Sequence, residues 1–140
     1  MHFITGGAFN GKRKWARSYY GLNEQPFVWH SFYEKDSDPA FSGEMVVLEG
    51  LEQYVKTLIE RNEEDVRQAW KSTLSEWIEW ENQETERQLV LIGTDITKGI
   101  VPIEASQRKW RDYTGWCFQD AAAKADRMDV IWYGINQQFK

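Results

Sequence analysis

The residues that could do chemistry stand near the start of the chain, where a short apolar run breaks into a glycine-rich loop followed by basic residues. The loop consists of Gly6, Gly7, Ala8, Phe9, Asn10, Gly11, Lys12 and Arg13. Its first and last glycines and its lysine fulfil the pattern G-x-x-x-x-G-K-[ST], in which backbone N–H groups bind the phosphates of a nucleotide. Arg13 stands where this pattern requires a hydroxyl group that binds Mg²⁺. We therefore expect residues 6–13 to bind nucleotide phosphates.

Lys12 and Arg13 are expected to affect phosphate binding and phosphoryl transfer differently. Lys12 is expected to act catalytically by placing a point charge on the β and γ phosphates, and a helix from about residue 12 adds its dipole. Neither effect needs residue 13, whereas the metal ion that bridges the β and γ oxygens does. Because a guanidinium can neutralise phosphate charge without acting as a Lewis acid, binding is expected to survive and phosphoryl transfer to be slow. The alternative is an ordinary glycine-rich turn.

The surrounding sequence predicts strands and helices in alternation. The expected strands span 3–5, 26–32, 44–49, 88–93 and 128–133. The expected helices begin at about residue 12 and then span 50–61, 62–81 and 104–126, with Asn62 capping the third helix and Asp65 in the box position. This order predicts an α/β, three-layer P-loop nucleotide-binding fold with a mostly parallel sheet of about five strands. A chain of 140 residues is expected to form one domain, 1–140.

Two carboxylates follow expected strands, at the edge where ligands bind in parallel sheets. Glu49 ends the third expected strand and Asp95 follows the fourth. Either side chain is placed to bind the metal ion or to activate the acceptor as a catalytic residue. The alternative is that each acid only ends its strand or caps the next helix.

The chain contains eight tryptophans, which could stack on the bases or another planar ligand or could pack in the hydrophobic core. Several apolar residues repeat at helical steps of three and four: Val66, Trp70, Leu74, Trp77 and Ile78. Such a stripe is typical of a core or of a subunit interface. Trp80 and Trp116 lie off their stripes and are the better candidates for contact with a partner.

Composition excludes several classes of protein. A net charge of −5 argues against binding to nucleic acid, and no apolar stretch approaches the length of about 18 residues that a membrane span needs. The apolar run at the N-terminus is too short for a signal peptide. A single cysteine, Cys117, suits a reducing compartment. We expect a cytoplasmic protein.

A second set of residues, toward the C-terminus, carries a family resemblance. It comprises Gly99-Ile100-Val101-Pro102, Arg108, Arg111-Asp112, Gly115, Gln119, Asp126, Gly134 and Lys140. With the glycines and lysine of the loop, these residues make the chain resemble the bifunctional adenosylcobinamide kinase and adenosylcobinamide-phosphate guanylyltransferase family of cobalamin biosynthesis. The resemblance implies phosphoryl transfer from ATP or GTP to the aminopropanol hydroxyl of a corrinoid, and a homo-oligomer. It also implies that Arg108 and Arg111 lie near the phosphates or the base.

Departures from the family pattern decide which reactions are expected to remain. Arg13 replaces a serine, Thr94-Asp95 replaces Asn-Glu, Thr97 replaces a glycine and Phe118 replaces an asparagine. The family's guanylylated histidine belongs to a longer segment than this chain has, and His30 reads instead as a partly buried strand histidine. We therefore expect that the guanylyltransferase step is lost. Three hypotheses follow: a kinase with an impaired Mg²⁺ site, a catalytically inactive nucleotide-binding or regulatory homologue, and a structural homologue that binds no nucleotide.

Overall fold

The computed structural model describes residues 1–35, 37–61 and 64–140. Its strands are β1 (His2–Gly6), β2 (Val28–Ser31), β3 (Met45–Glu49), β4 (Gln88–Thr94), β5 (Arg127–Trp132) and β6 (Ile135–Gln138). Its helices are α1 (Lys12–Tyr20), α2 (Leu51–Glu60), α3 (Val66–Asn82) and α4 (Ala105–Lys124). The order along the chain is the expected alternation of strands and helices, with one further strand at the end.

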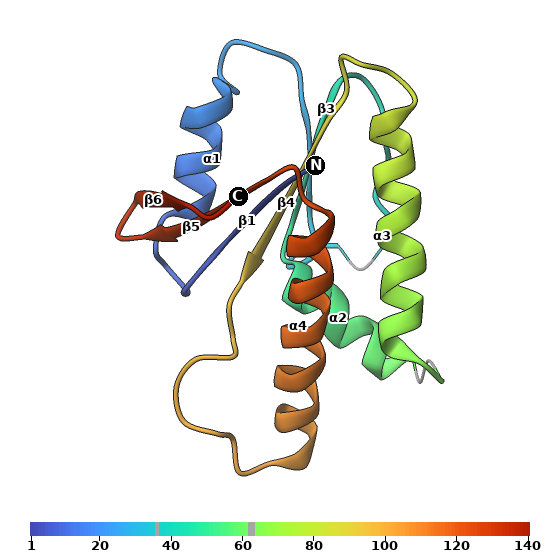
Figure 1. The fold of residues 1–140 in the computed structure, drawn as a ribbon, viewed down its shortest axis with the longest axis vertical. Coiled ribbons are helices and arrows are strands. Elements are labelled where there is room, and N and C mark those ends of the chain that lie inside the picture. The colour runs from blue at the N-terminus through green and yellow to red at the C-terminus, as the bar shows by residue number, and fades with distance from the viewer. Residues whose placement is uncertain (36, 62–63) are drawn as a thin grey trace.

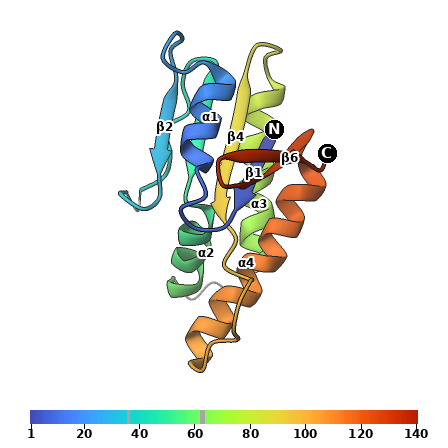
Figure 2. The ribbon, with the colours of Figure 1, turned by 90° about the vertical axis from the view of Figure 1, so that its left-hand side faces the viewer.

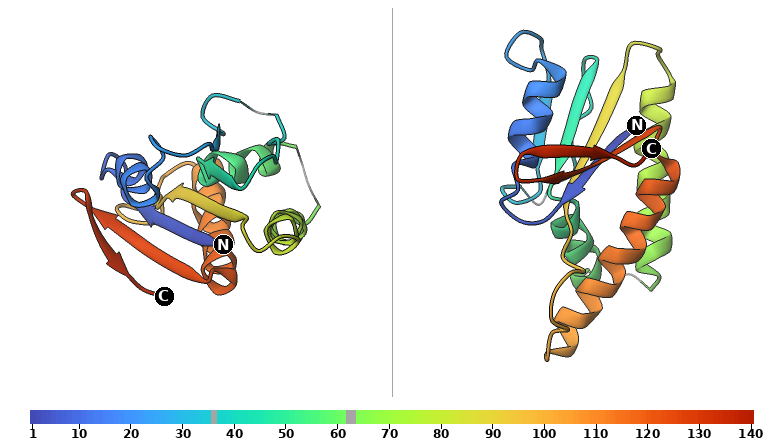
Figure 3. Two further views of the ribbon diagram at one scale, coloured as in Figure 1. Left: turned by 90° about the horizontal axis from the view of Figure 1, so that it is seen from above. Right: turned by 60° about the vertical axis from the view of Figure 1, so that its left-hand side comes forward.

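The strands form one sheet in the order β2-β3-β4-β1-β5-β6. The first five strands are parallel and β6 runs antiparallel to β5. Helix α1 covers one face, and α2, α3 and α4 cover the other (Figure 1 and Figure 3, left). Figure 2 looks onto the α1 face, with α3 and α4 behind the sheet. The predicted three-layer α/β fold with a mostly parallel sheet is confirmed.

Alternation along the strands divides the core between the two faces, because successive side chains of a strand point to opposite sides. On the face of α2, α3 and α4, Phe3 and Leu91 belong to the larger cluster. On the face of α1, Ile4 and Ile92 pack with Ala16 in a smaller cluster. Strands buried on both faces explain the nearly continuous apolar runs in the sequence.

The tryptophan stripe of α3 is part of the larger cluster. Val66, Trp70, Leu74 and Trp77 are all buried, and Ile78 is partly buried against them. Outside the stripe, Trp80 packs on Phe41 with ring centroids 5.1 Å apart, and Trp116 is 42% exposed. The interpretation of the stripe as core is therefore confirmed.

Most element ends lie within two residues of the sequence predictions, but α3 and β2 begin later than predicted and one strand was not predicted. Helix α3 begins at Val66 and is capped by Asp65, whose side chain accepts a hydrogen bond from the N–H of Gln68. Asp65 is thus the cap itself, and the cap predicted at Asn62 lies outside the described residues. Strand β2 is shorter than predicted. Strand β6 was not expected because its four residues, Ile135–Gln138, are all exposed and lack an apolar alternation.

The carboxyl ends of β3, β4 and β1 lie side by side. Glu49 pairs in register with Ile92, and Gly6 pairs with Thr94. Beyond this edge, the segment 95–104 and the first turns of α4 extend past the sheet (Figure 1 and Figure 3, right). In the part of the chain that the structure describes, no helix has the length and apolar character to cross a membrane.

Candidate functional site

A cavity of about 790 Å³ opens at this edge of the sheet. It lies between the glycine-rich loop, the N-terminus of α1 and the first turn of α2. Its lining residues come from five segments: Ala8, Phe9, Asn10, Gly11, Lys12, Arg13, Lys14, Tyr33, Glu49, Glu52, Gln53, Ile92, Thr94, Ile96 and Trp110. Six of the eight loop residues from 6 to 13 therefore line one cavity, and phosphate binding there stays a prediction.

The loop is held to the turn between β5 and β6. The carbonyl of Asn10 accepts the N–H of Gly134 at 2.8 Å, and its Oδ1 accepts the N–H of Tyr133 at 3.0 Å. At Gly6 the φ angle is +148°, and a Cβ atom would lie 2.3 Å from the carbonyl oxygen of Ile131. Only glycine fits there, which explains why the motif begins at this residue.

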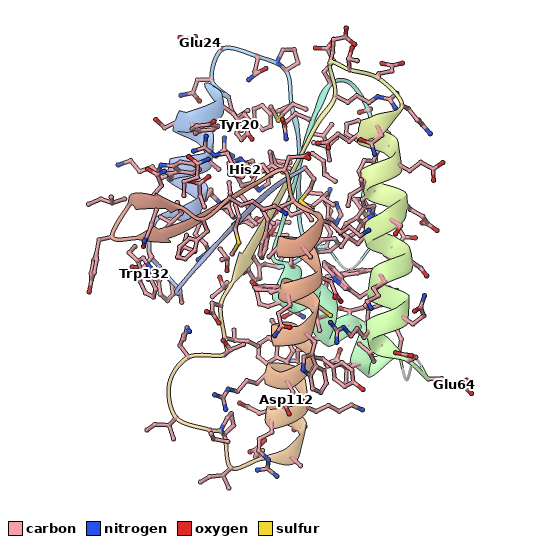
Figure 4. The ribbon with its side chains drawn as sticks, in the orientation of Figure 1. His2, Tyr20, Glu24, Glu64, Asp112 and Trp132 are labelled. Atoms are coloured by element: carbon pink, nitrogen blue, oxygen red, sulfur yellow. The ribbon has the colours of Figure 1, made fainter. Side chains whose placement is uncertain are left out.

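Two aromatic residues, Phe9 and Trp132, lie in or beside the loop. Phe9 has a φ of 59° and is fully exposed. Trp132 lies beside the turn that leaves β1 (Figure 4), and a Cβ at Gly7 would approach its ring to 3.7 Å. Phe9 is also one of the residues that line the cavity.

Lys12 points back into the loop. Its Nζ donates to the carbonyl oxygen of Gly7 at 2.7 Å. Burial lowers the pKa of Lys12, and the nearby carboxylates of Glu52 and Glu49 oppose that shift. The ammonium is therefore placed where a bound phosphate would meet both it and the N-terminus of α1.

Arg13 forms a bidentate ion pair with Glu49. Its Nε donates to Oε1 at 3.0 Å and its Nη2 donates to Oε2 at 2.7 Å. The indole N–H of Trp29 donates to the same Oε2 at 2.8 Å. Hydrogen bonding to Glu49 raises the pKa of the Arg13 guanidinium. The side chain of Arg13 is 52% exposed against 10% for Glu49, so a buried carboxylate holds a guanidinium that faces the cavity.

Residues around Arg13 do not fit an Mg²⁺ ion held by the protein. Mg²⁺ requires oxygen ligands in octahedral geometry, whereas position 13 supplies N–H donors and both oxygens of Glu49 accept N–H groups. Within residues 1–35, 37–61 and 64–140, no group of three or more His, Cys, Asp or Glu side chains could hold a metal ion. Catalytic or metal-binding roles for Glu49 and Asp95 stay predictions.

Asp95 lies at the expected strand end but turns toward its own loop. Its N–H donates to the carbonyl of Gly6 at 2.9 Å. Its Oδ1 accepts the N–H of Thr97 at 2.8 Å and the Thr97 hydroxyl at 2.5 Å. Among the described residues, Thr94 and Ile96 on either side of it line the cavity.

Arg108 and Arg111 hold the segment 95–104. The Arg108 guanidinium donates to the carbonyl oxygens of Pro102, at 3.1 Å, and Ile103. Arg111 donates twice to the carbonyl of Thr97, at 3.1 and 2.9 Å. A contact of either arginine with phosphate or base stays a prediction, and it requires that the guanidinium leave these carbonyls.

Glu52 and Trp110 line the cavity and were missed by sequence reasoning. Glu52 is only 3% exposed, and burial raises its pKa. The indole N–H of Trp110 donates to the Glu52 carbonyl at 2.7 Å. The available signal was spacing: Glu52 follows Glu49 by three positions, and a helix that begins between them turns it toward the same edge.

His30 is a buried strand residue, as predicted. It lies in β2, is 8% exposed and packs on Phe32 with ring centroids 4.8 Å apart. Its Nε2 is buried and finds no hydrogen-bond partner among the described residues. Burial lowers its pKa, so the ring is held neutral.

One comparison with known proteins identifies the family. The family model described as cobinamide kinase / cobinamide phosphate guanyltransferase matches residues 30–139, well over half of the chain. The match begins after the glycine-rich loop, where Arg13 departs from the motif. No curated protein matches the chain significantly. The family acts in cobalamin biosynthesis with nucleotide and corrinoid substrates. The chain therefore belongs to the cobinamide kinase / cobinamide phosphate guanyltransferase family.

Proposed function

We propose that the chain binds the triphosphate of ATP or GTP in the cavity beside residues 6–13, as the first step of a kinase reaction. The observation that carries the proposal is the placement of two adjacent cations, Lys12 and Arg13, on one wall of that cavity. They stand at the N-terminus of α1 and at the carboxyl ends of three parallel strands, where anions bind in such folds. A volume of about 790 Å³ is also in the range of small-ligand sites.

Arg13 supplies part of the positive charge of the metal ion but not its chemistry. Glu49 engages Nε and Nη2, which leaves the guanidinium further N–H groups for phosphate oxygens. Hydrogen bonds from a guanidinium to phosphate are strong and independent of Mg²⁺. Because no Lewis acid then polarises the γ-phosphate, phosphoryl transfer is slow. The acceptor is the aminopropanol hydroxyl of a corrinoid, whose ring would lie outside the cavity.

The guanylyltransferase step is absent in this proposal. A guanylylated histidine must reach the nucleotide, whereas His30 is 8% exposed and packs on Phe32, just after the end of β2. His2, the other histidine of the chain, is 1% exposed, and its ring nitrogens are hydrogen-bonded to Asp129 and Tyr20.

Calorimetric titration tests nucleotide binding. ATP and GTP are titrated into wild type and Lys12→Ala, with and without Mg²⁺, and Lys124→Ala, at the far end of α4, serves as the matched control. We expect binding without Mg²⁺ that weakens at least tenfold in Lys12→Ala and is unchanged in the control. Equal affinities in all three proteins, or none in wild type, would refute binding at the loop.

A second candidate is a nucleotide-binding or regulatory homologue without catalysis. Arg13 favours it, because this residue lacks the hydroxyl of the motif and its ion pair occupies the Glu49 carboxylate, so neither group serves a metal ion. Production of ADP or GDP that depends on added adenosylcobinamide distinguishes the two functions. If wild type forms more ADP or GDP than Lys12→Ala does, the kinase is supported. If nucleotide binds and no product forms, the inactive nucleotide-binding homologue is supported.

We further infer a cytoplasmic homo-oligomer. The lone thiol, Cys117, is free and buried, which suits a reducing compartment. On the far edge of the sheet, Ile135 and Phe139 are 71% and 61% exposed, and β6 presents an open edge to a second copy. Light scattering on the purified protein measures the mass, and a monomer at all concentrations would contradict the oligomer.

A further inference from the structure

The cavity contains a buried carboxylate, Glu52, in the first turn of α2. It is 3% exposed and yet lines the cavity together with Lys12 and Arg13. Burial of a carboxylate is costly unless the charge is compensated. Such a group in a ligand cavity is a candidate for a proton-transfer role.

The other two carboxylates at this edge are already engaged. Both oxygens of Glu49 accept N–H groups, from Arg13 and from Trp29. Oδ1 of Asp95 accepts two hydrogen bonds from Thr97, and the side chain turns toward that loop. Neither is as well placed as Glu52 to accept a proton from a ligand in the cavity.

The hydrogen bonds of Glu52 fix its orientation and leave it acceptor capacity. Oε1 accepts the N–H of Thr94 at 2.7 Å. The Tyr33 hydroxyl lies 2.6 Å from both carboxylate oxygens. A phenol has a single proton and can donate to one oxygen at a time, so Oε2 retains lone pairs for another donor.

One cation and three neutral hydrogen-bond donors, the backbone N–H of Gln53 among them, stabilise the ionised Glu52. Lys12 of α1 favours the ionised carboxylate, and the hydroxyl of Tyr33 and the N–H of Thr94 also stabilise it. Glu49, at the end of β3, is neutralised by Arg13. Burial outweighs these contacts and raises the pKa of Glu52. A carboxylate with a raised pKa is a better proton acceptor near neutral pH than an ordinary one.

We propose that Glu52 accepts the proton of the alcohol that receives the phosphoryl group, an inference that rests on the proposed function. The alcohol oxygen forms a bond to the γ-phosphorus of the nucleoside triphosphate. The bond from that phosphorus to the β–γ bridging oxygen breaks, and the nucleoside diphosphate leaves. The alcohol proton passes to Oε2 of Glu52. Tyr33 is a positioning residue, because its hydroxyl holds the carboxylate.

Three variants test this role: Glu52→Gln, Tyr33→Phe and, as a matched control on the exposed end of α2, Glu60→Gln. Affinity for ATP is measured by calorimetry, folding by thermal melting, and adenosylcobinamide-dependent ADP production as a function of pH. We expect Glu52→Gln to lower kcat about 100-fold or more, as loss of a general base does, and to change ATP affinity less than about threefold. The control should match wild type in all three measurements.

The pH profile separates a chemical role from a structural one. Wild-type kcat should rise with pH along a limb that reports deprotonation of Glu52, and Glu52→Gln should lack this limb. Tyr33→Phe should keep the limb and move it to higher pH, because the lost hydrogen bond had lowered the pKa of Glu52. This variant retains the carboxylate, so it tests the role even if Glu52→Gln folds poorly.

Three outcomes would overturn the inference. In the first, Glu52→Gln keeps a kcat within tenfold of wild type or keeps the pH-dependent limb. In the second, ATP affinity of Glu52→Gln falls as much as its kcat, which indicates a structural role. The third is wild type that binds ATP but yields no acceptor-dependent product, which refutes the proton acceptor and leaves nucleotide binding intact. Failure of the proposed function itself would appear as absence of ATP binding in wild type.

Discussion

At the scale of single residues, the arginine that replaces the hydroxyl residue of the motif forms an ion pair that the motif does not contain. Arg13 replaces a hydroxyl residue, and Glu49, 36 positions later, binds its guanidinium through two hydrogen bonds. Trp29 adds a third N–H donor to the same carboxylate. The cation is therefore part of the folded site and is held in place, which a freely exposed arginine would not be.

Arg13→Ser should restore dependence on Mg²⁺. The change supplies the missing hydroxyl and frees Oε1 of Glu49, while Trp29 still donates to Oε2. Hydroxyl and carboxylate oxygens are ligand types that Mg²⁺ prefers. Because each 1.4 kcal/mol of transition-state stabilisation is about tenfold in rate, we expect at least about tenfold faster Mg²⁺-dependent turnover. Initial rates of adenosylcobinamide phosphorylation, measured across Mg²⁺ concentrations, check this prediction.

Arg17→Ser is the matched control for Arg13→Ser. It removes the same charge from the same helix, and Arg17 stacks on Trp29 at 4.6 Å from the ring centroid. Its response to Mg²⁺ should equal that of wild type. If Arg13→Ser and Arg17→Ser respond to Mg²⁺ alike, Arg13 does not stand in for the metal ion.

At the scale of elements, α3 supplies the core on which the site is built. Trp70 is fully buried and contacts Trp77 edge to face, with ring centroids 6.0 Å apart, and Tyr54 of α2 at 6.2 Å. Since Glu52 precedes Tyr54 on α2, packing between α2 and α3 positions one wall of the cavity.

Trp70→Ala should destabilise the fold by about 3–5 kcal/mol, the usual effect of removing a large buried aromatic side chain. Trp116→Ala provides the comparison, because Trp116 is 42% exposed and its loss should change stability by about 0.5 kcal/mol or less. Urea unfolding followed by far-ultraviolet circular dichroism measures both. Similar midpoints for the two variants would show that α3 contributes little to the core.

At the scale of the whole molecule, a charged network closes the edge of the sheet opposite the cavity. Nε2 of His2 lies 2.7 Å from Asp129, and its Nδ1 lies 2.6 Å from the hydroxyl of Tyr20. Figure 4 shows His2 and Tyr20 on adjoining elements. Asp129 is fully buried and also accepts hydrogen bonds from Arg127 and Asn136. The network ties β1, β5, β6 and α1 together.

Stability should fall as the pH falls below about 6.5. Burial lowers the pKa of His2, and of His30 as well, so the unfolded chain binds protons that the folded chain does not. The loss begins near the unfolded pKa of about 6.5 and is absent above about pH 7.5. Urea unfolding of wild type and His2→Asn between pH 5 and 8 measures it, and the variant should show a shallower slope.

Glu52 contributes to the same titration with the opposite sign. Its raised pKa makes the folded chain hold a proton that the unfolded chain has released, so its contribution to stability grows as the pH falls. Because Glu52 is present in both wild type and His2→Asn, its contribution cancels when the free energies of unfolding of the two proteins are subtracted at each pH. Identical slopes for the two proteins would contradict a neutral His2 in the folded state.

Local patterns in the sequence were enough to predict the loop at residues 6–13, the order of strands and helices, the core stripe of α3 and the place of Glu49 and Asp95 at strand ends. Each depends on residues close in the chain, through glycine conformation or through a period of two or 3.6 residues. The sequence could not predict β6, because an exposed edge strand is defined by its partner and not by its own pattern.

Only the tertiary structure paired Arg13 with Glu49 and Trp29, and Glu52 with Tyr33 and Thr94. These residues are far apart in sequence and meet because β2, β3, β4 and β1 are neighbours in one parallel sheet. Strand order and register decide such contacts, and no local period encodes them. The sequence alone therefore determined that a glycine-rich loop followed by two basic residues is present, and the fold decided which charges surround it.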